Sequence, residues 1–220
     1  MSSDANSLIQ NVFRPISGRT LLLFVAVLAV VEVLAAWFLR DHPHGLIGIL
    51  ALFYAAALLS VVLAVLPMGR DGPKALGLRE AGWRYGVFGA LGTLVLSVTA
   101  SWLGPEPEGM KQVMELAQDP AKLLPSLFAF ALLAPVVEEL VFRGLLYGWI
   151  ESRWGSVVAL VVSSLAFAGA HYEPAHIVLV LPLGFLFGWL RRRTNSLAPS
   201  LVSHIVNNGF AVLSAAYLGS

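Results

Sequence analysis

Long apolar runs, separated by short charged or Pro- and Gly-containing breaks, make up most of this 220-residue chain. A helix needs roughly 20 apolar residues to cross the ~30 Å hydrocarbon core of a membrane, and most of the runs reach that length. Backbone groups inside lipid must be paired within their own segment, so each run is expected to be helical. The pattern predicts an all-α, polytopic transmembrane bundle of about seven spans, near residues 20–39, 46–67, 85–104, 123–150, 156–171, 175–190 and 197–218.

The breaks divide the chain without separating it into independent domains. The fifth and sixth runs are short, which predicts tilted helices that meet in a loop around Tyr172, Glu173 and Pro174. The first run follows a polar stretch and has no cleavage site after it, so we expect it to be retained as a span. We therefore divide the chain into a cytoplasmic N-terminal segment (1–19), a transmembrane region without a recognised motif (20–122) and a core that carries the polar motifs (123–220).

Charges in the short connections predict the orientation, because basic connections favour the cytoplasmic side. The connections that would face one side are rich in Lys and Arg, and the connection at 105–122 is acidic. The N-terminus is therefore expected inside and the C-terminus outside. The basic residues expected inside are Arg14, Arg19, Arg70, Lys74, Arg79, Arg84, Arg153, Arg191, Arg192 and Arg193; the acidic residues expected outside are Glu106, Glu108, Glu115 and Asp119.

Composition narrows the function classes. Hydrophobic residues make up 58% and charged residues 12% of the chain, against about 25% charged in a soluble domain. The absence of cysteine excludes a disulfide framework, a thiolate metal site and a cysteine nucleophile. The net charge is +1, and the basic residues lie between helices rather than on one face, so no nucleic-acid partner is expected.

The fourth run contains three charges, each of which costs about 2.5–3.5 kcal/mol at the bilayer centre on insertion scales. Glu139 and Arg143 are four residues apart on one helical face with the acid first, the favourable order for an ion pair. Glu138 points about 100° away and lacks this partner, which suits a general base. Pro135 removes a backbone hydrogen bond one turn earlier and is expected to open a small polar space. The alternative is a buried packing network of the three charges.

Polar groups also occur in two later runs. Phe167 precedes His171 by four residues at the end of the fifth run, and the seventh run carries His204 and Asn208 one turn apart. Each group alone fits an ordinary interhelical hydrogen bond. Counting helical rise brings Glu138 and both histidines within reach of the middle of the membrane, so we expect them to converge with Asn208 in a water-holding site.

Such a set supports peptide hydrolysis, which needs a nucleophilic water, a base and donors for the developing oxyanion. Glu138 is the candidate base, His171 would share or orient the water, and His204 with Asn208 would donate to the oxyanion. This scheme needs no cofactor. Two histidines and a glutamate with an open position also form a known catalytic zinc combination, so Zn held by Glu138, His171 and His204 is the alternative.

Small residues near these motifs are interpreted as structural. Ser163, Ser164 and Ser203 are not spaced to pair with a base and an orienting acid, so we interpret them as packing or cavity-lining residues. Gly184 and Gly188 have the small-xxx-small spacing that is typical of close helix packing.

Three motifs in this order resemble the CAAX protease and bacteriocin-processing family of intramembrane endopeptidases, which includes the Ras-converting CAAX endopeptidases. The resemblance extends from about Pro135 to the C-terminus. It implies a helical membrane endopeptidase whose site lies in a cavity within the bilayer. The residues that carry it are Glu138-Glu139-x-x-x-Arg143, Phe167-x-x-x-His171 and His204-x-x-x-Asn208.

Family membership would make 123–220 the catalytic core and Glu138 the water-activating residue, supported by the Glu139 and Arg143 pair. It implies His171 as a second catalytic residue, with His204 and Asn208 as oxyanion stabilisers. Members have been described both as metalloproteases and as glutamate-dependent enzymes. The resemblance also implies a membrane-associated protein or peptide substrate and a place in a bacterial cytoplasmic membrane.

The resemblance leaves substrate and partners open. The first three spans carry no recognised motif, and the span count is one short of the CAAX endopeptidase arrangement. Bacterial relatives have roles in bacteriocin immunity, signalling-peptide processing and trimming of sorting anchors, so a prenylated substrate is not assumed. A non-catalytic immunity or scaffold protein is the second hypothesis. The third is a transporter or proton relay that uses Glu32, for which no inverted repeat is visible.

Overall fold

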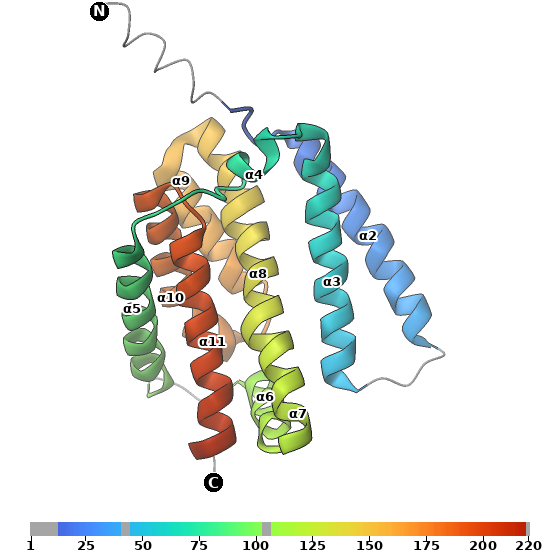
Figure 1. Ribbon diagram of the computed structural model, residues 1–220, viewed down its shortest axis with the longest axis vertical. Helices are drawn as coiled ribbons and strands as arrows, with labels where there is room; N and C mark the ends of the chain where they lie inside the picture. Colours follow the sequence, from blue (N-terminus) through green and yellow to red (C-terminus); the bar gives the residue numbers. More distant parts are fainter. Residues whose placement is uncertain (1–12, 41–44, 103–106, 219–220) are drawn as a thin grey trace, which may run out of the picture.

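The computed structural model describes residues 13–40, 45–102 and 107–218, which form helices with no strand among them. The all-α prediction is confirmed. The long helices run side by side along the longest axis of the molecule (Figure 1). In chain order the elements are α2 (Gly18–Arg40), α3 (Leu46–Val65), η1 (Leu66–Met68), α4 (Asp71–Ala75), α5 (Trp83–Ser101), α6 (Glu108–Gln118), α7 (Pro120–Ser126), η2 (Leu127–Leu133), α8 (Ala134–Glu138), η3 (Glu139–Leu146), α9 (Tyr147–Gly169), α10 (Pro174–Thr194) and α11 (Ala198–Leu218).

Five helices in the described parts of the chain are long and apolar enough to cross a membrane, fewer than the about seven predicted. One difference is α5, which is rich in glycine, serine and threonine and is not among the five. The other is the 50-residue run Pro120–Gly169, which contains two predicted spans. Within it Gly155 has φ 82° and ψ 169°, a conformation that glycine adopts without strain, and the chain turns back there (Figure 1).

Several predictions fall on residues outside the described ranges. These are the first 12 residues of the N-terminal segment, Glu106 in the acidic connection and the last two positions of the predicted span 85–104. Elsewhere the predicted runs coincide with helices, and residues 170–173 form the predicted loop between α9 and α10.

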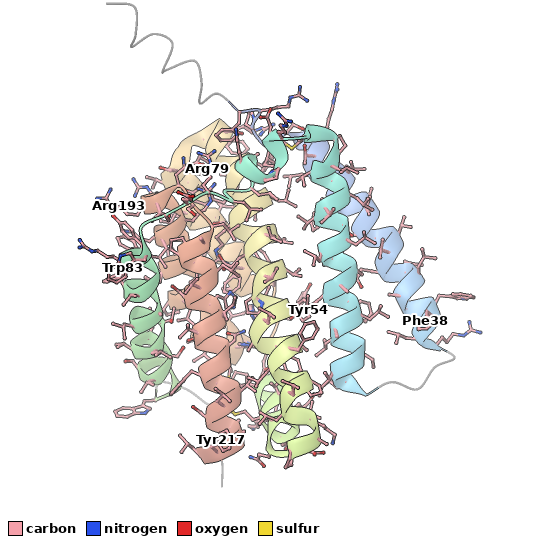
Figure 2. All side chains as sticks on the ribbon, viewed as in Figure 1. Phe38, Tyr54, Arg79, Trp83, Arg193 and Tyr217 are labelled. Carbon is pink, nitrogen blue, oxygen red and sulfur yellow. The ribbon has the colours of Figure 1, made fainter. Side chains whose placement is uncertain are left out.

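Not all of the basic residues that were expected in the inner connections lie in connections. Figure 2 shows Arg79 and Arg193 toward the end opposite Tyr217. The prediction that Arg191, Arg192 and Arg193 lie in a loop is wrong, because α10 continues to Thr194 and its last turn favours cations. Arg191 is 2% exposed, and its Nε donates to the carbonyl oxygen of Arg143 at 3.1 Å. It is therefore a packing group of the fold.

Small residues allow α10 to lie close to α9, as predicted for Gly184 and Gly188. A Cβ atom on Gly184 would lie 3.1 Å from Cδ1 of Phe167, and one on Gly188 would lie 3.0 Å from Oγ of Ser164. Both contacts are tight, so the spacing serves packing. The three serines near the motifs are buried and also serve packing, because each hydroxyl donates to a backbone carbonyl: Ser163 to Leu160 at 3.4 Å, Ser164 to Gly184 at 2.9 Å and Ser203 to Pro199 at 2.7 Å.

Polar contacts fix the amphipathic helix α6 at both of its ends. The backbone N–H of Glu108 donates to Oε1 of Glu173 at 2.9 Å, which ties the start of α6 to the loop before α10. At the other end Asp119 caps α7 by accepting from the N–H of Ala121 at 2.9 Å. The hydrogen bond and charge of Lys122, 2.8 Å away, together with this cap hold the pKa of Asp119 below its ordinary value.

The close approach of α10 to α9 can be tested with two matched glycine substitutions. Gly188→Ala should destabilise the protein by about 1–3 kcal/mol, because the added methyl group overpacks the contact with Ser164. Gly169→Ala should not, because nothing lies within 4 Å of the added atom. Thermal midpoints of both variants in detergent provide the measurement. Equal midpoints for the two variants would contradict the packing role of Gly188.

Candidate active site

The helix that carries Glu138 is widened by π-helical turns on both sides of α8, namely η2 and η3. The N–H of Ala134 bonds the carbonyl of Ala129, five residues back. The next carbonyl in this pattern belongs to Phe130, and its partner would be Pro135, which has no N–H. The side-chain amide of Asn208 donates to that carbonyl at 3.0 Å. Asn208 therefore fills a gap that Pro135 leaves and joins α11 to η2.

Glu139 and Arg143 form the ion pair that their spacing predicts. Nη1 of Arg143 lies 3.2 Å from Oε1 of Glu139, and both side chains are 0% exposed. Nη2 of Arg143 donates to the carbonyl of Gly184 at 3.0 Å, and its guanidinium lies 4.2 Å from the ring centre of Phe167. The pair thus connects η3 to both α9 and α10.

His204 lies between the two adjacent glutamates. Its Nδ1 is 3.2 Å from Oε1 of Glu139, and its Nε2 is 3.6 Å from Oε2 of Glu138. A carboxylate ion-paired with Arg143 only accepts, so Nδ1 donates to Glu139 and Nε2 faces Glu138. The imidazole ring stacks on Phe187 with 4.7 Å between ring centres. Sequence reasoning missed this bridge because it joins two helices far apart in the chain.

A cavity of ≈ 250 Å³ collects the predicted catalytic residues on one wall. Glu138 has 17% of its side chain exposed, whereas the neighbouring Glu139 has none. The remaining wall is mainly apolar and comes from α3, α6, η2, α10 and α11. The polar side chains that line the cavity are Tyr54, Glu138, His171, His176, His204 and Asn208.

His171 follows the last turn of α9 and is held by it. Its Nδ1 lies 2.9 Å from the carbonyl oxygen of Phe167, which can only accept, so Nδ1 carries a proton and Nε2 is the nitrogen left for other partners. Phe167 lines the cavity too, and its ring makes edge contacts with both His171 and His204. The four-residue spacing of Phe167 and His171 therefore corresponds to a ring contact in the structure.

Two residues on the cavity wall were not predicted. His176, in the first turn of α10, has its ring centre 4.4 Å from that of His171. Tyr54 of α3 donates its hydroxyl to Oε1 of Glu138 at 3.3 Å. His176 follows His171 by only five residues, and that proximity was the signal that could have drawn attention to it. Tyr54 carried no signal beyond a hydroxyl in an apolar run.

Zinc held by Glu138, His171 and His204 stays a prediction. Within the residues that the structure covers, no group of three His, Asp or Glu side chains is placed to hold a metal ion. His171 and His204 each use Nδ1 for a protein hydrogen bond. Each histidine therefore has one nitrogen left, and His204 turns that nitrogen toward Glu138 at 3.6 Å.

Comparison with known proteins finds a related family. Residues 120–210 match the family described as type II CAAX prenyl endopeptidase Rce1-like. This part of the chain belongs to that family. The matched region contains the cavity residues Glu138, His171, His204 and Asn208, and it excludes Tyr54.

Two bacterial relatives of this chain carry membrane protease names. A Bacillus subtilis (strain 168) protein named "Putative membrane peptidase YdiL" is 24% identical over 180 residues, covering 78% of this chain and 72% of the relative. The Staphylococcus aureus (strain USA300) protein named membrane-embedded CAAX protease MroQ is 30% identical over 93 residues, covering 40% of this chain and 38% of the relative. No solved structure matches the chain. The chain thus has several helices apolar enough to span a membrane, and its residues 120–210 belong to the membrane CAAX protease family.

The buried ion pair can be tested through stability. Arg143→Met should destabilise the protein by about 3–5 kcal/mol, because it leaves the charge of Glu139 buried without Arg143. Glu139→Gln/Arg143→Met removes both charges and should cost less than the single change. Thermal midpoints in detergent measure both variants. A double variant that is less stable than Arg143→Met would contradict the pairing.

Proposed function

We propose that this chain is an intramembrane endopeptidase in which Glu138 activates a water molecule for peptide hydrolysis. The observation that carries the proposal is the difference between two adjacent acids. Glu139 is fully buried and bound to Arg143 and His204. Glu138 is the only acid among the described residues that line the cavity, and it is partly open to that cavity. Only Glu138 is therefore positioned to accept a proton from water.

The proposed reaction uses two proton transfers through one carboxylate. Glu138 takes a proton as the water oxygen attacks the peptide carbonyl carbon. The tetrahedral intermediate then collapses, the C–N bond breaks, and the protonated Glu138 gives its proton to the leaving nitrogen. His171 offers Nε2 to the same water, because its Nδ1 is used by the carbonyl of Phe167. No cofactor is required for this sequence.

Two donors serve the developing oxyanion. Nδ1 of His204 is bound to Glu139, so Nε2 is the nitrogen turned toward Glu138, and in this proposal Nε2–H donates to the oxyanion that develops on the substrate. Asn208 has two amide hydrogens, and the carbonyl of Phe130 uses one of them. The second hydrogen is available to the oxyanion. The amide therefore combines a packing role with a catalytic one.

The substrate in this proposal is a membrane-associated protein or peptide in a bacterial cytoplasmic membrane. The cavity lies among helices that are apolar enough to span a bilayer, and most of its wall is apolar. A segment that reaches it must therefore be partly apolar itself. The Staphylococcus aureus relative is named a membrane-embedded CAAX protease, which supports this substrate class.

Glu138→Ala should lower cleavage by at least about 100-fold, because the general base is lost. Glu32→Ala is the matched control, since Glu32 is another acid in a spanning helix but does not line the cavity. The measurement compares protein termini across the membrane proteomes of cells that carry wild type or either variant. New termini in wild type and Glu32→Ala, absent from Glu138→Ala, are expected.

Other outcomes of this comparison separate the competing functions. Full cleavage by Glu138→Ala would exclude the proposed role of Glu138. No new termini from a folded wild type would favour an immunity or scaffold protein, in which shape and hydrogen bonding matter. Addition of a chelator to the purified wild type should leave cleavage unchanged, and chelator-sensitive cleavage would support zinc.

We further propose that the N-terminus faces the cytoplasm. Because the chain lacks cysteine, single cysteines can report the orientation. Arg193 lies toward the end opposite Tyr217 in an exposed position, and Lys122 lies in α7 after the acidic helix α6. A membrane-impermeant thiol reagent applied to intact cells should label Lys122→Cys but not Arg193→Cys. The opposite labelling would reverse the orientation.

A further inference from the structure

We infer that Tyr54 is a positioning residue for Glu138, so that the helical half without a recognised motif contributes directly to the active site. The inference rests on the proposed function, because it concerns the residue that activates water. Tyr54 belongs to α3, which lies outside the family match over residues 120–210. Figure 2 shows Tyr54 on the side of α3 that faces α8.

The contact distinguishes the two oxygens of Glu138. Oε1 accepts the hydroxyl proton of Tyr54 at 3.3 Å, whereas Oε2 faces Nε2 of His204 at 3.6 Å. A glutamate with three rotatable side-chain bonds adopts many orientations unless a neighbour restricts it. Two contacts from opposite helices restrict both oxygens. Tyr54 thereby holds the carboxylate in the orientation that the proton transfer needs.

Tyr54 is the only α3 side chain that can do this. Apart from Tyr54, the one hydrogen-bonding side chain in α3 is Ser60, whose hydroxyl donates to the carbonyl of Ala56 at 2.8 Å. Leu50, one turn before Tyr54, lines the same cavity with an apolar surface. The hydroxyl of Tyr54 is therefore the single polar group that α3 presents to Glu138.

The fold holds α3 on both sides of Tyr54. Before it, Ile47, Leu50 and Ala51 pack against an apolar cluster that includes Phe130 of η2. After it, Val61 and Ala64 belong to a second apolar cluster, with Phe24 of α2 and Leu145 of η3. Because each cluster also contains part of the helix that carries Glu138, the position of Tyr54 relative to that residue is set by packing on both sides. The contact between Tyr54 and Glu138 is therefore held in place by apolar packing before and after Tyr54 in α3.

Tyr54→Phe tests the inference, because it removes the hydroxyl and keeps the ring. The assay is cleavage of a quenched fluorescent peptide that spans the site revealed by the comparison of termini. We expect kcat to fall about tenfold, as for loss of a hydrogen bond to a charged group, with KM within about twofold of wild type. Ser60→Ala is the matched control, since it removes a buried hydroxyl from the same helix, and it should leave kcat unchanged.

A second background shows whether Tyr54 acts through Glu138. Glu138→Asp shortens the carboxylate, so the hydroxyl of Tyr54 no longer reaches it. In that background Tyr54→Phe should lower kcat less than in wild type, which is the coupling expected of residues in contact. A role in folding alone would instead lower the thermal midpoint and leave kcat per folded molecule unchanged.

The outcomes separate this inference from the proposed function. Unchanged kcat in Tyr54→Phe, with Glu138→Ala inactive, would overturn the role of Tyr54 and leave the endopeptidase intact. A raised KM with unchanged kcat would place Tyr54 on the substrate and would also overturn the inference. Full activity of Glu138→Ala would overturn the proposed function, and the role of Tyr54 with it.

Discussion

The buried ion pair between Glu139 and Arg143 is the constraint on which the rest of the site depends. Both charged side chains are fully buried, and burial of a charge costs too much free energy unless the charge has close partners. Arg143 finds a second partner in the carbonyl of Gly184, and Glu139 finds one in His204. The need to satisfy two charges therefore fixes three helices around one point. The glycine at 184 matters for the same reason, because it lets α10 come close enough.

This constraint explains why two adjacent acids have different tasks. Helical geometry turns Glu139 into the protein and Glu138 toward the cavity, about 100° apart. Glu139 orients His204 through Nδ1, and His204 then faces Glu138 through Nε2. One acid thus organises the partner that the other acid uses. This arrangement leaves Glu138 partly open to the cavity while Glu139, which supports His204, is fully buried.

The division of the chain into a motif-bearing half and a motif-free half does not hold at the cavity. The family match covers residues 120–210, yet α3 supplies Tyr54 and α6 supplies part of the apolar wall. α6 is also tied by Glu173 to the loop that carries His171. The family match covers most of the polar side chains of the cavity, whereas part of its apolar wall comes from α3 and α6, which lie outside the match.

The sequence by itself determined the helical membrane class, the positions of most spans, the ion pair of Glu139 with Arg143 and the packing role of Gly184, because each follows from spacing within one segment. It did not determine the span count. The apolar run that contains α5 is long enough for a span, but α5 is too weakly apolar to be among the five candidate spans. The turn at Gly155 lies inside one continuous 50-residue run that the sequence had divided into two spans. Only the tertiary structure decided that His204 bridges two glutamates, that Asn208 caps the carbonyl freed by Pro135, and that Tyr54 reaches Glu138. These contacts join residues between 65 and 84 positions apart. The periodicity within one helix does not indicate which faces of distant helices will be in contact. Those contacts are determined by how the helices pack in the folded protein.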